Sequence, residues 1–216
     1  MNYELIIFDM DGTILNTLED LRDSLNFALR ATGFPERTLE EVRRFVGNGI
    51  RKLIERGVPA GTSQADVDTV HQAFTPYYKE HCADKTRPYD GIVELLQKLR
   101  AAGCRTAVVS NKADPAVQEL CTQYFDGLFD AAVGDREGIA RKPAPDSVNE
   151  VLRLLNTDRP HAVYIGDSEV DVATAANAGL DCIAVTWGFR EVEFLREQGA
   201  KVFADTPEEV FRLLQS

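Results

Sequence analysis

Two aspartates separated by one residue follow the first apolar stretch of the chain. Residues 3–8 form a short run rich in β-formers, which indicates a buried strand that ends at Asp9. Side chains spaced i, i+2 on an extended backbone point to the same side, so Asp9 and Asp11 are presented together. The carboxyl end of a parallel strand is where ligands bind in an α/β protein. Because Asp11-Gly12 is also a common turn signal, a simple turn is the alternative for this segment taken alone.

Further polar residues occur where a predicted strand ends or a helix begins. These are Ser110 and Asn111 after a strand over 105–109, Lys142 in a loop before a helix, and Asp167 with Asp171 after a strand over 161–165. Taken singly, such residues are explained by helix-capping turns or by a solvated loop lysine. Their joint occurrence, each at a strand end or a helix start, favours one shared site.

The types of these side chains indicate phosphoryl transfer. Carboxylates that converge at a sheet edge repel one another unless a cation lies between them, and the oxygens of Asp9, Asp11 and Asp167 suit Mg²⁺. Lys142 and the hydroxyl of Ser110 would bind an anion that faces the metal. Stabilisation of charge carries most of the catalysis in phosphoryl transfer, and an aspartate can act as the nucleophile.

The elements that would position these residues fall into two blocks. Residues 17–83 show helical spacing of apolar residues and no convincing strand, with a capping box at Thr38-Leu39-Glu40-Glu41 and a kink or break predicted at Pro76. From residue 87 onward, helices and strands alternate, and Asp114 is predicted to cap a helix that starts at Pro115. Such alternation predicts a parallel sheet covered by helices. The simplest architecture is one α/β domain, residues 1–16 and 84–216, with a helical insertion over 17–83.

Composition restricts the function classes. The net charge of −11 disfavours a nucleic-acid partner, because polyanions need a basic face. No apolar stretch is long enough to span a membrane, and no basic segment followed by an apolar one opens the chain, which argues against insertion and secretion. The four cysteines form no Cys-x-x-Cys pair and are expected to be free thiols in a reducing cytoplasm. The three histidines are scattered, which gives little support to a zinc site or a Ser-His-Asp triad.

The chain resembles the haloacid dehalogenase superfamily over nearly its whole length. The resemblance lies in four motifs: Asp9-Met10-Asp11-Gly12-Thr13, Ser110, Lys142, and Gly166-Asp167 followed by Asp171. It implies a Rossmann-like core flanked by helices, with residues 17–83 as a small helical cap. The presence of both Asp9 and Asp11 favours phosphate esters over carbon–halogen substrates.

The same resemblance implies a role for each motif residue. Asp9 would be the nucleophile, and Asp11 would protonate the leaving oxygen, activate water and contact Mg²⁺ through its carbonyl. The phosphoryl oxygens would be held by Ser110, Asn111 and Lys142. Asp167 would ligate the metal together with Asp9, and Asp171 would support the ligand shell.

Substrate choice is expected to depend on the cap. The closest resemblance is to phosphoglycolate phosphatases, through chain length and the segments 46–49 and 186–189. It implies a small phosphorylated metabolite as the substrate of a monomer or homodimer. Asn48 and Arg51 are the candidate specificity residues; the alternatives are a simple helix–helix turn for Asn48 and a solvated helix face, which is the commoner case, for Arg51. A β-phosphoglucomutase-like or sugar-phosphate phosphatase shares the same motifs, and a catalytically silent binding module on this fold is a further alternative.

Overall fold

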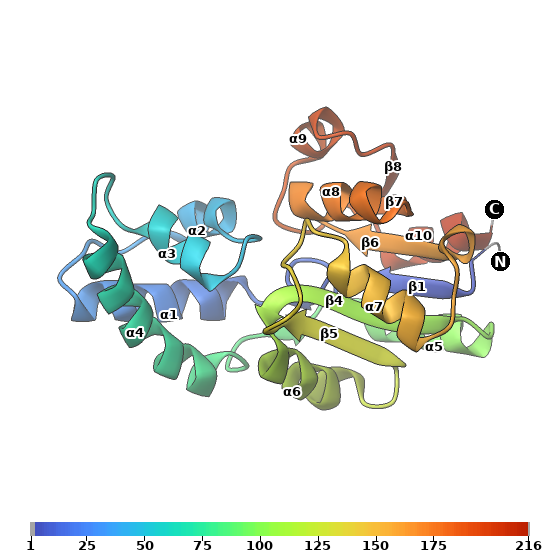
Figure 1. The fold of residues 1–216 in the computed structure, drawn as a ribbon, viewed down its shortest axis with the longest axis horizontal. Coiled ribbons are helices and arrows are strands. Elements are labelled where there is room, and N and C mark those ends of the chain that lie inside the picture. Colours follow the sequence, from blue (N-terminus) through green and yellow to red (C-terminus); the bar gives the residue numbers. More distant parts are fainter. Residues whose placement is uncertain (1–2, 216) are drawn as a thin grey trace. The chain divides into compact units, whose positions relative to one another are not determined.

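Six parallel strands form one sheet in the structure, a computed structural model that describes residues 3–215 (Figure 1). The chain divides into two compact units, the core unit (residues 3–15 and 88–215) and the helical unit (Asn16–Arg87). The strands of the sheet are β1 (Leu5–Phe8), β4 (Arg105–Ala113), β5 (Ala131–Asp135), β6 (Ala162–Gly166), β7 (Asp181–Val185) and β8 (Val202–Ala204). The sheet belongs to the core unit.

The strand order β5-β4-β1-β6-β7-β8 places β1 inside the sheet. Leu5 of β1 is in register with Arg105 of β4 on one side and with Ala162 of β6 on the other. All four residues of β1 are apolar and buried, as a strand covered on both faces requires. The chain proceeds from β1 to β4 and β5 in one direction and then from β6 to β8 in the other. The order therefore reverses between β1 and β6, which is where ligands bind in open α/β sheets.

Helices cover both faces of this sheet (Figure 1). They are α5 (Ile92–Ala101), α6 (Asp114–Phe125), α7 (Asp146–Leu154), α8 (Glu169–Ala178), α9 (Val192–Glu197) and α10 (Pro207–Gln215), with a short 3₁₀ helix over Arg159–His161. α7 contacts α8, and α5 contacts α10, while a buried cluster that includes Leu5, Val109, Val148 and Val151 joins strands to helices. The predicted Rossmann-like α/β fold, with helices inserted after the first strand, is confirmed.

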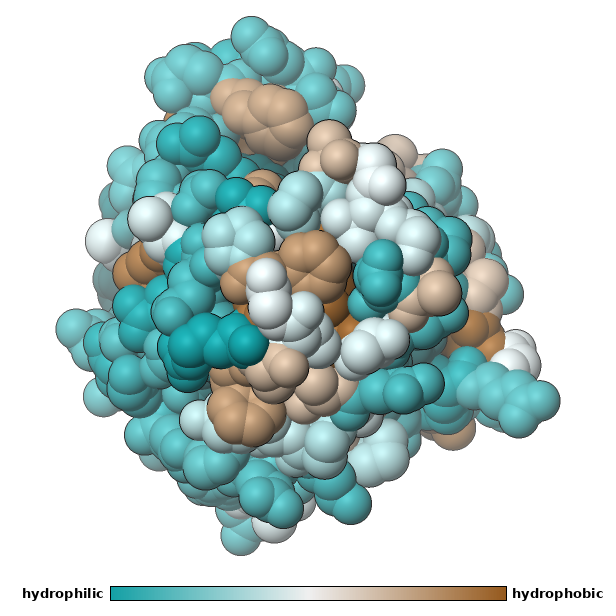
Figure 2. All heavy atoms as spheres, turned by 90° about the vertical axis from the view of Figure 1, so that its left-hand side faces the viewer, coloured by the Kyte–Doolittle hydropathy of each residue, from teal (hydrophilic) through white to brown (hydrophobic). Residues whose placement is uncertain are grey.

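The helical unit contains α1 (Leu18–Ala31), α2 (Leu39–Phe45), α3 (Ile50–Gly57) and α4 (Gln64–His81). The predicted capping box is present, because Thr38 Oγ1 accepts from the Glu41 amide at 3.2 Å and Glu41 Oε2 accepts from the Thr38 amide at 2.8 Å. Hydrophilic side chains dominate the face shown in Figure 2, around a small group of apolar ones. Among residues 3–215, no helix is long and apolar enough to cross a membrane.

The structure differs from three local predictions. α4 continues through Pro76, which excludes the predicted break and leaves the alternative of a kink; Val70 and Phe74 pack in the core of the unit and outweigh one lost backbone hydrogen bond. Asp114 does not cap α6; its carboxylate accepts from the Gly134 amide at 2.8 Å and from Arg136 at 3.0 Å. β4 continues past Val109 to Ala113, with a shift in its register against β5.

Two very short strands lie where the chain passes between the units. β2 (Leu15–Asn16) and β3 (Arg87–Pro88) form a separate two-stranded sheet. A strand of two residues is too short to show an alternating pattern, so neither β2 nor β3 could be predicted from periodicity. No strand occurs over 17–83, all of which the structure describes.

Candidate active site

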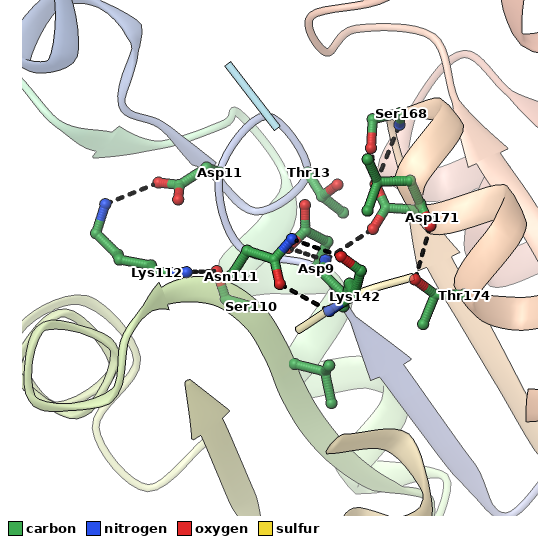
Figure 3. Close-up of polar contacts among 12 residues, drawn as sticks. Asp9, Asp11, Thr13, Ser110, Asn111, Lys112, Lys142, Ser168, Asp171 and Thr174 are labelled. Atoms are coloured by element: carbon green, nitrogen blue, oxygen red, sulfur yellow. Dashed lines mark hydrogen bonds and ion pairs between the residues drawn. The ribbon is translucent and has the colours of Figure 1, made fainter. Parts of the chain in front are cut away.

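The end of β1 and the start of α8 bring two of the predicted core residues, Asp9 and Asp171, to the ammonium group of Lys142 (Figure 3). Lys142 Nζ lies 2.7 Å from Asp9 Oδ1 and 2.8 Å from Asp171 Oδ1. It also contacts the hydroxyl of Tyr164 at 3.0 Å. Asp9 follows β1 directly, while Asp171 lies in the first turn of α8. Residues far apart in the sequence thus form one buried ionic cluster.

Three carboxylates of this cluster are positioned to hold a metal ion. Single oxygens of Asp9, Asp167 and Asp171 all lie within 4.8 Å of one another, and all three residues are buried. When ionised, three carboxylates and the one ammonium of Lys142 carry a net charge of −2 (−3 + 1). Buried charge of this kind needs compensation, and a divalent cation supplies it. The donor atoms are all oxygens, which suits a hard cation.

The protonation equilibria reflect this excess of negative charge. Burial and the charge of Asp171 raise the pKa of Asp167 to about 7, although hydrogen bonds from Phe189 and Thr13 act against the rise. Burial and the neighbouring carboxylates hold the pKa of Asp9 well above its usual range, despite the opposing effect of Lys142. Burial by itself would lower the pKa of Lys142, but the charges of Asp171 and Asp9 outweigh it and raise that pKa. The lysine therefore stays charged.

Asp167 is held in a tightly enclosed position. Its carboxylate accepts from the hydroxyl of Thr13 at 3.0 Å and from the backbone amide of Phe189 at 2.7 Å. A Cβ atom added to Gly12 would lie 2.4 Å from Asp167 Oδ2, and one added to Gly188 would lie 2.2 Å from Asp167 Cβ. The backbone at Gly12 also has φ +91°, a conformation that favours glycine. Glycine at both positions is what lets two backbone segments approach this carboxylate.

Asp171 forms a capping box with Ser168 at the start of α8. Its Oδ2 accepts from the Ser168 hydroxyl at 2.6 Å and from the Ser168 amide at 3.1 Å, while Oδ1 accepts from the hydroxyl of Tyr164 at 3.1 Å. Both oxygens of this carboxylate are therefore engaged, which orients it towards Lys142.

Asp11 lies outside the three-carboxylate cluster. Its carboxylate pairs instead with the ammonium of Lys112 at 3.1 Å, and the Lys112 side chain is only 3% exposed. The hydroxyl of Ser110 accepts from the Lys112 amide at 3.2 Å. Asn111 exchanges two hydrogen bonds with the backbone of Lys142, at 2.9 and 3.1 Å, and so fixes the loop that carries the lysine (Figure 3).

Sequence reasoning missed three residues of this site. Lys112 follows Ser110-Asn111 directly and could have been noticed as a third polar residue at the same strand end. Thr13 belongs to the first motif, but the motif alone indicates no role for its hydroxyl. Tyr164 sits in an apolar strand, where its hydroxyl was the sole sign of a polar role.

The two predicted specificity residues lie in the helical unit. Asn48, between α2 and α3, accepts from Arg56 at 2.8 Å. Arg51 forms an ion pair with Asp68 at 2.5 Å and a longer one with Glu55 at 3.4 Å. Their role in specificity stays a prediction.

Comparisons with known proteins agree with this arrangement. The family model described as haloacid dehalogenase-like hydrolase matches residues 6–185. A phosphoglycolate phosphatase from Mesorhizobium japonicum is 34% identical over 195 residues, which cover 88% of this chain and 86% of that protein. A crystal structure of a candidate phosphoglycolate phosphatase from Lactobacillus delbrueckii subsp. bulgaricus has a TM-score of 0.94 and 42% identity, with 97% of both chains covered.

A third relative was solved with a ligand. CbbY from Rhodobacter sphaeroides, in complex with phosphate, has a TM-score of 0.77 and 29% identity, with 96% of both chains covered. The predicted enzyme class, a phosphoric monoester hydrolase, is confirmed by these relatives taken together. The chain belongs to the haloacid dehalogenase-like hydrolase family.

Proposed function

We propose that the chain is a Mg²⁺-dependent phosphatase that hydrolyses a small phosphomonoester through an aspartyl-phosphate on Asp9. The observation that carries this proposal is the buried cluster in which Lys142 bridges Asp9 and Asp171 beside Asp167. The ammonium neutralises part of the charge on Asp9, which allows an anionic phosphoryl group to approach it.

The residues present suit a bound Mg²⁺, which would be held by carboxylate oxygens of Asp9 and Asp167 and by the backbone carbonyl of Asp11. When bound, the ion would neutralise charge that develops on the phosphoryl oxygens. Asp171, whose oxygens are engaged by Lys142 and Ser168, would support this arrangement from behind.

Two displacements would complete the reaction. In the first, an oxygen of Asp9 bonds to phosphorus while the bond to the leaving oxygen breaks, and Asp11 donates a proton to that oxygen. In the second, Asp11 takes a proton from water, whose oxygen attacks the phosphorus and releases inorganic phosphate from Asp9. Ser110, Asn111 and Lys142 would hold the phosphoryl oxygens through both steps.

We further propose phosphoglycolate as the substrate, with residues 1–16 and 84–216 as the catalytic domain and 17–83 as the cap. The support is that the relative from Mesorhizobium japonicum is a phosphoglycolate phosphatase. A substrate carboxylate would pair with Arg51 and would have to compete there with Asp68 and Glu55. Asn48 is the second candidate specificity residue.

A sugar-phosphate phosphatase or β-phosphoglucomutase-like enzyme is the second candidate. It is favoured by a further solved structure, an aspartate-to-asparagine variant of CbbY in complex with xylulose-1,5-bisphosphate, which is 26% identical with a TM-score of 0.72.

The mechanism is tested by release of phosphate from p-nitrophenyl phosphate with and without Mg²⁺. We expect Mg²⁺-dependent hydrolysis by the wild type, and a loss of about 10⁴-fold or more in the isosteric variant Asp9→Asn, because the nucleophile is removed. If Asp9→Asn hydrolyses the ester as fast as the wild type, Asp9 is not the nucleophile.

The substrate is tested by comparing kcat/KM for phosphoglycolate with that for sugar phosphates. We expect Arg51→Ala to raise KM for phosphoglycolate about tenfold and to leave KM for p-nitrophenyl phosphate unchanged, because only the first carries a carboxylate. Equal effects on both esters would rule out carboxylate recognition by Arg51, and a preference for sugar phosphates would favour the second candidate.

A further inference from the structure

A segment that follows β7 reaches the site from a part of the chain outside the four motifs. Within it, the backbone amide of Phe189 donates to Asp167 at 2.7 Å, and the indole N–H of Trp187 donates to the carbonyl oxygen of Thr13 at 3.0 Å. Thr13 in turn donates its hydroxyl to Asp167 at 3.0 Å. Phe189 therefore contacts the Asp167 carboxylate directly, and Trp187 is linked to the same carboxylate through Thr13.

The packing around Gly188 makes the position of Asp167 depend on this segment. A Cβ on Gly188 would lie 2.2 Å from Asp167 Cβ, and Gly12 approaches the same carboxylate from the opposite loop. Asp167 is 1% exposed and is approached closely by two backbone segments, so its side chain has little room to move independently of them. A displacement of the segment is therefore expected to displace the carboxylate.

Trp187 is the residue that ties the segment to the loop after β1. Its half-buried indole also packs near Tyr89, with ring centroids 6.5 Å apart, and the Tyr89 amide donates to the carbonyl of Ile14 at 3.2 Å. The indole is thus connected to residues 13 and 14 by one direct hydrogen bond and by one aromatic neighbour. A phenyl ring at this position would preserve most of the packing and remove only the N–H donor.

We infer that Trp187 is a positioning residue: through its hydrogen bond to Thr13 and the adjoining Gly188-Phe189 backbone, it fixes Asp167 where a divalent cation can bind. This inference rests on the proposed function, because it assigns Asp167 to the metal. Trp187 itself touches neither substrate nor metal in this scheme.

The test measures Mg²⁺ binding by calorimetry in the absence of substrate, for the wild type and Trp187→Phe. We expect the dissociation constant for Mg²⁺ to rise about fivefold in Trp187→Phe, the effect of one lost hydrogen bond, and the melting temperature to change little. Gly188→Ala, which forces Asp167 to move, is expected to raise the constant by more than tenfold.

The matched control is Tyr3→Phe. It removes one aromatic hydrogen bond, from the Tyr3 hydroxyl to Asp181 at 2.7 Å, and Asp181 lies at the opposite end of β7 from the site. Tyr3→Phe is expected to bind Mg²⁺ like the wild type. An unchanged dissociation constant in Trp187→Phe, an equal weakening in Tyr3→Phe, or a wild type that binds no Mg²⁺ would each overturn the inference.

Calorimetry separates this inference from the proposed function. A wild type that binds Mg²⁺ but hydrolyses no phosphate ester would refute the proposed function. The difference in the Mg²⁺ dissociation constant between Trp187→Phe and Tyr3→Phe would still measure how far Trp187 positions Asp167.

Discussion

Charged residues are used differently in the two units of this protein. In the core unit, Lys142 is 3% exposed and contacts three polar side chains, and Lys112 is equally buried against Asp11. In the helical unit, Arg51 is 39% exposed and Arg44 is 72% exposed, each in ion pairs open to solvent. A buried charge is costly to leave without its partner, whereas an exposed pair contributes little. The buried lysines of the core unit are therefore held to their partners, whereas exposed pairs such as that of Arg44 with Glu40 contribute little to the stability of the helical unit.

Among substitutions of lysine, the largest loss of kcat is expected at Lys142. Lys142→Met should lower kcat for p-nitrophenyl phosphate by about 10³-fold, because a charge aimed at the reacting phosphoryl group is lost. The matched control is Lys98→Met, which removes an exposed lysine of the same unit that pairs with Glu208 and should leave kcat unchanged. Steady-state kinetics at saturating Mg²⁺ measure both. Similar rates in the two variants would mean that burial of the lysine serves stability alone.

A smaller effect is expected at Lys112. Lys112→Met should lower kcat about tenfold to a hundredfold, because Asp11 loses the charged partner at 3.1 Å that orients its carboxylate. The KM should change little, since the proposed role of Lys112 is towards Asp11 and not towards the substrate. A rise in KM with unchanged kcat would instead place Lys112 in substrate binding.

The stability of the metal-free protein should depend on pH through Asp167. Its pKa is raised to about 7, so the folded state holds a proton that the unfolded chain has released above its ordinary pKa near 4. The stabilisation from this group is therefore present at low pH and is lost as pH rises from about 4 to 7.

Thermal unfolding in EDTA and in Mg²⁺ at pH 5.5 and pH 8 tests this expectation. Mg²⁺ should raise the melting temperature by several degrees at pH 8, and by less at pH 5.5, where protons compete for the carboxylate. Asp167→Asn, which cannot titrate, is the control and should show a smaller response to both pH and metal. An equal effect of Mg²⁺ at the two pH values would contradict the raised pKa.

The smallest effect, a change in the stability of the fold, is expected from a substitution of Arg44. Arg44→Ala removes an exposed i,i+4 pair with Glu40 and should change the free energy of unfolding by about 0.5 kcal/mol or less. Urea denaturation measures it. A loss of several kcal/mol would mean that exposed ion pairs of the helical unit stabilise the protein as strongly as the buried pairs of the core unit.

The parts of the fold that were predictable rest on local patterns. β1 is a continuous apolar run, the helical unit shows helical spacing, and the core motifs lie at strand ends, so the sheet and the approach of Asp9 to Asp167 followed from the sequence. The third carboxylate of the cluster did not, because it belongs to Asp171 while the carboxylate of Asp11 pairs with Lys112. The continuation of α4 through Pro76 did not follow, because it depends on packing against the rest of its unit.

The partners of polar side chains were less predictable for the same reason. Asp114 has the sequence context of an N-cap, yet it binds Gly134 and Arg136, which the fold brings close from about 20 residues away. The pairing of Lys112 with Asp11 joins residues separated by 101 positions. Such contacts depend on which strands become neighbours in the sheet, and the strand order cannot be predicted from a local sequence pattern.

The enclosure of Asp167 by Gly12 and Gly188 has a consequence for ionic size. The metal site proposed above would therefore contain one ligand whose position is held by the backbone on two sides. Such a ligand would suit the short oxygen distances and strict octahedral geometry of Mg²⁺ better than the larger and more variable ligand shell of Ca²⁺.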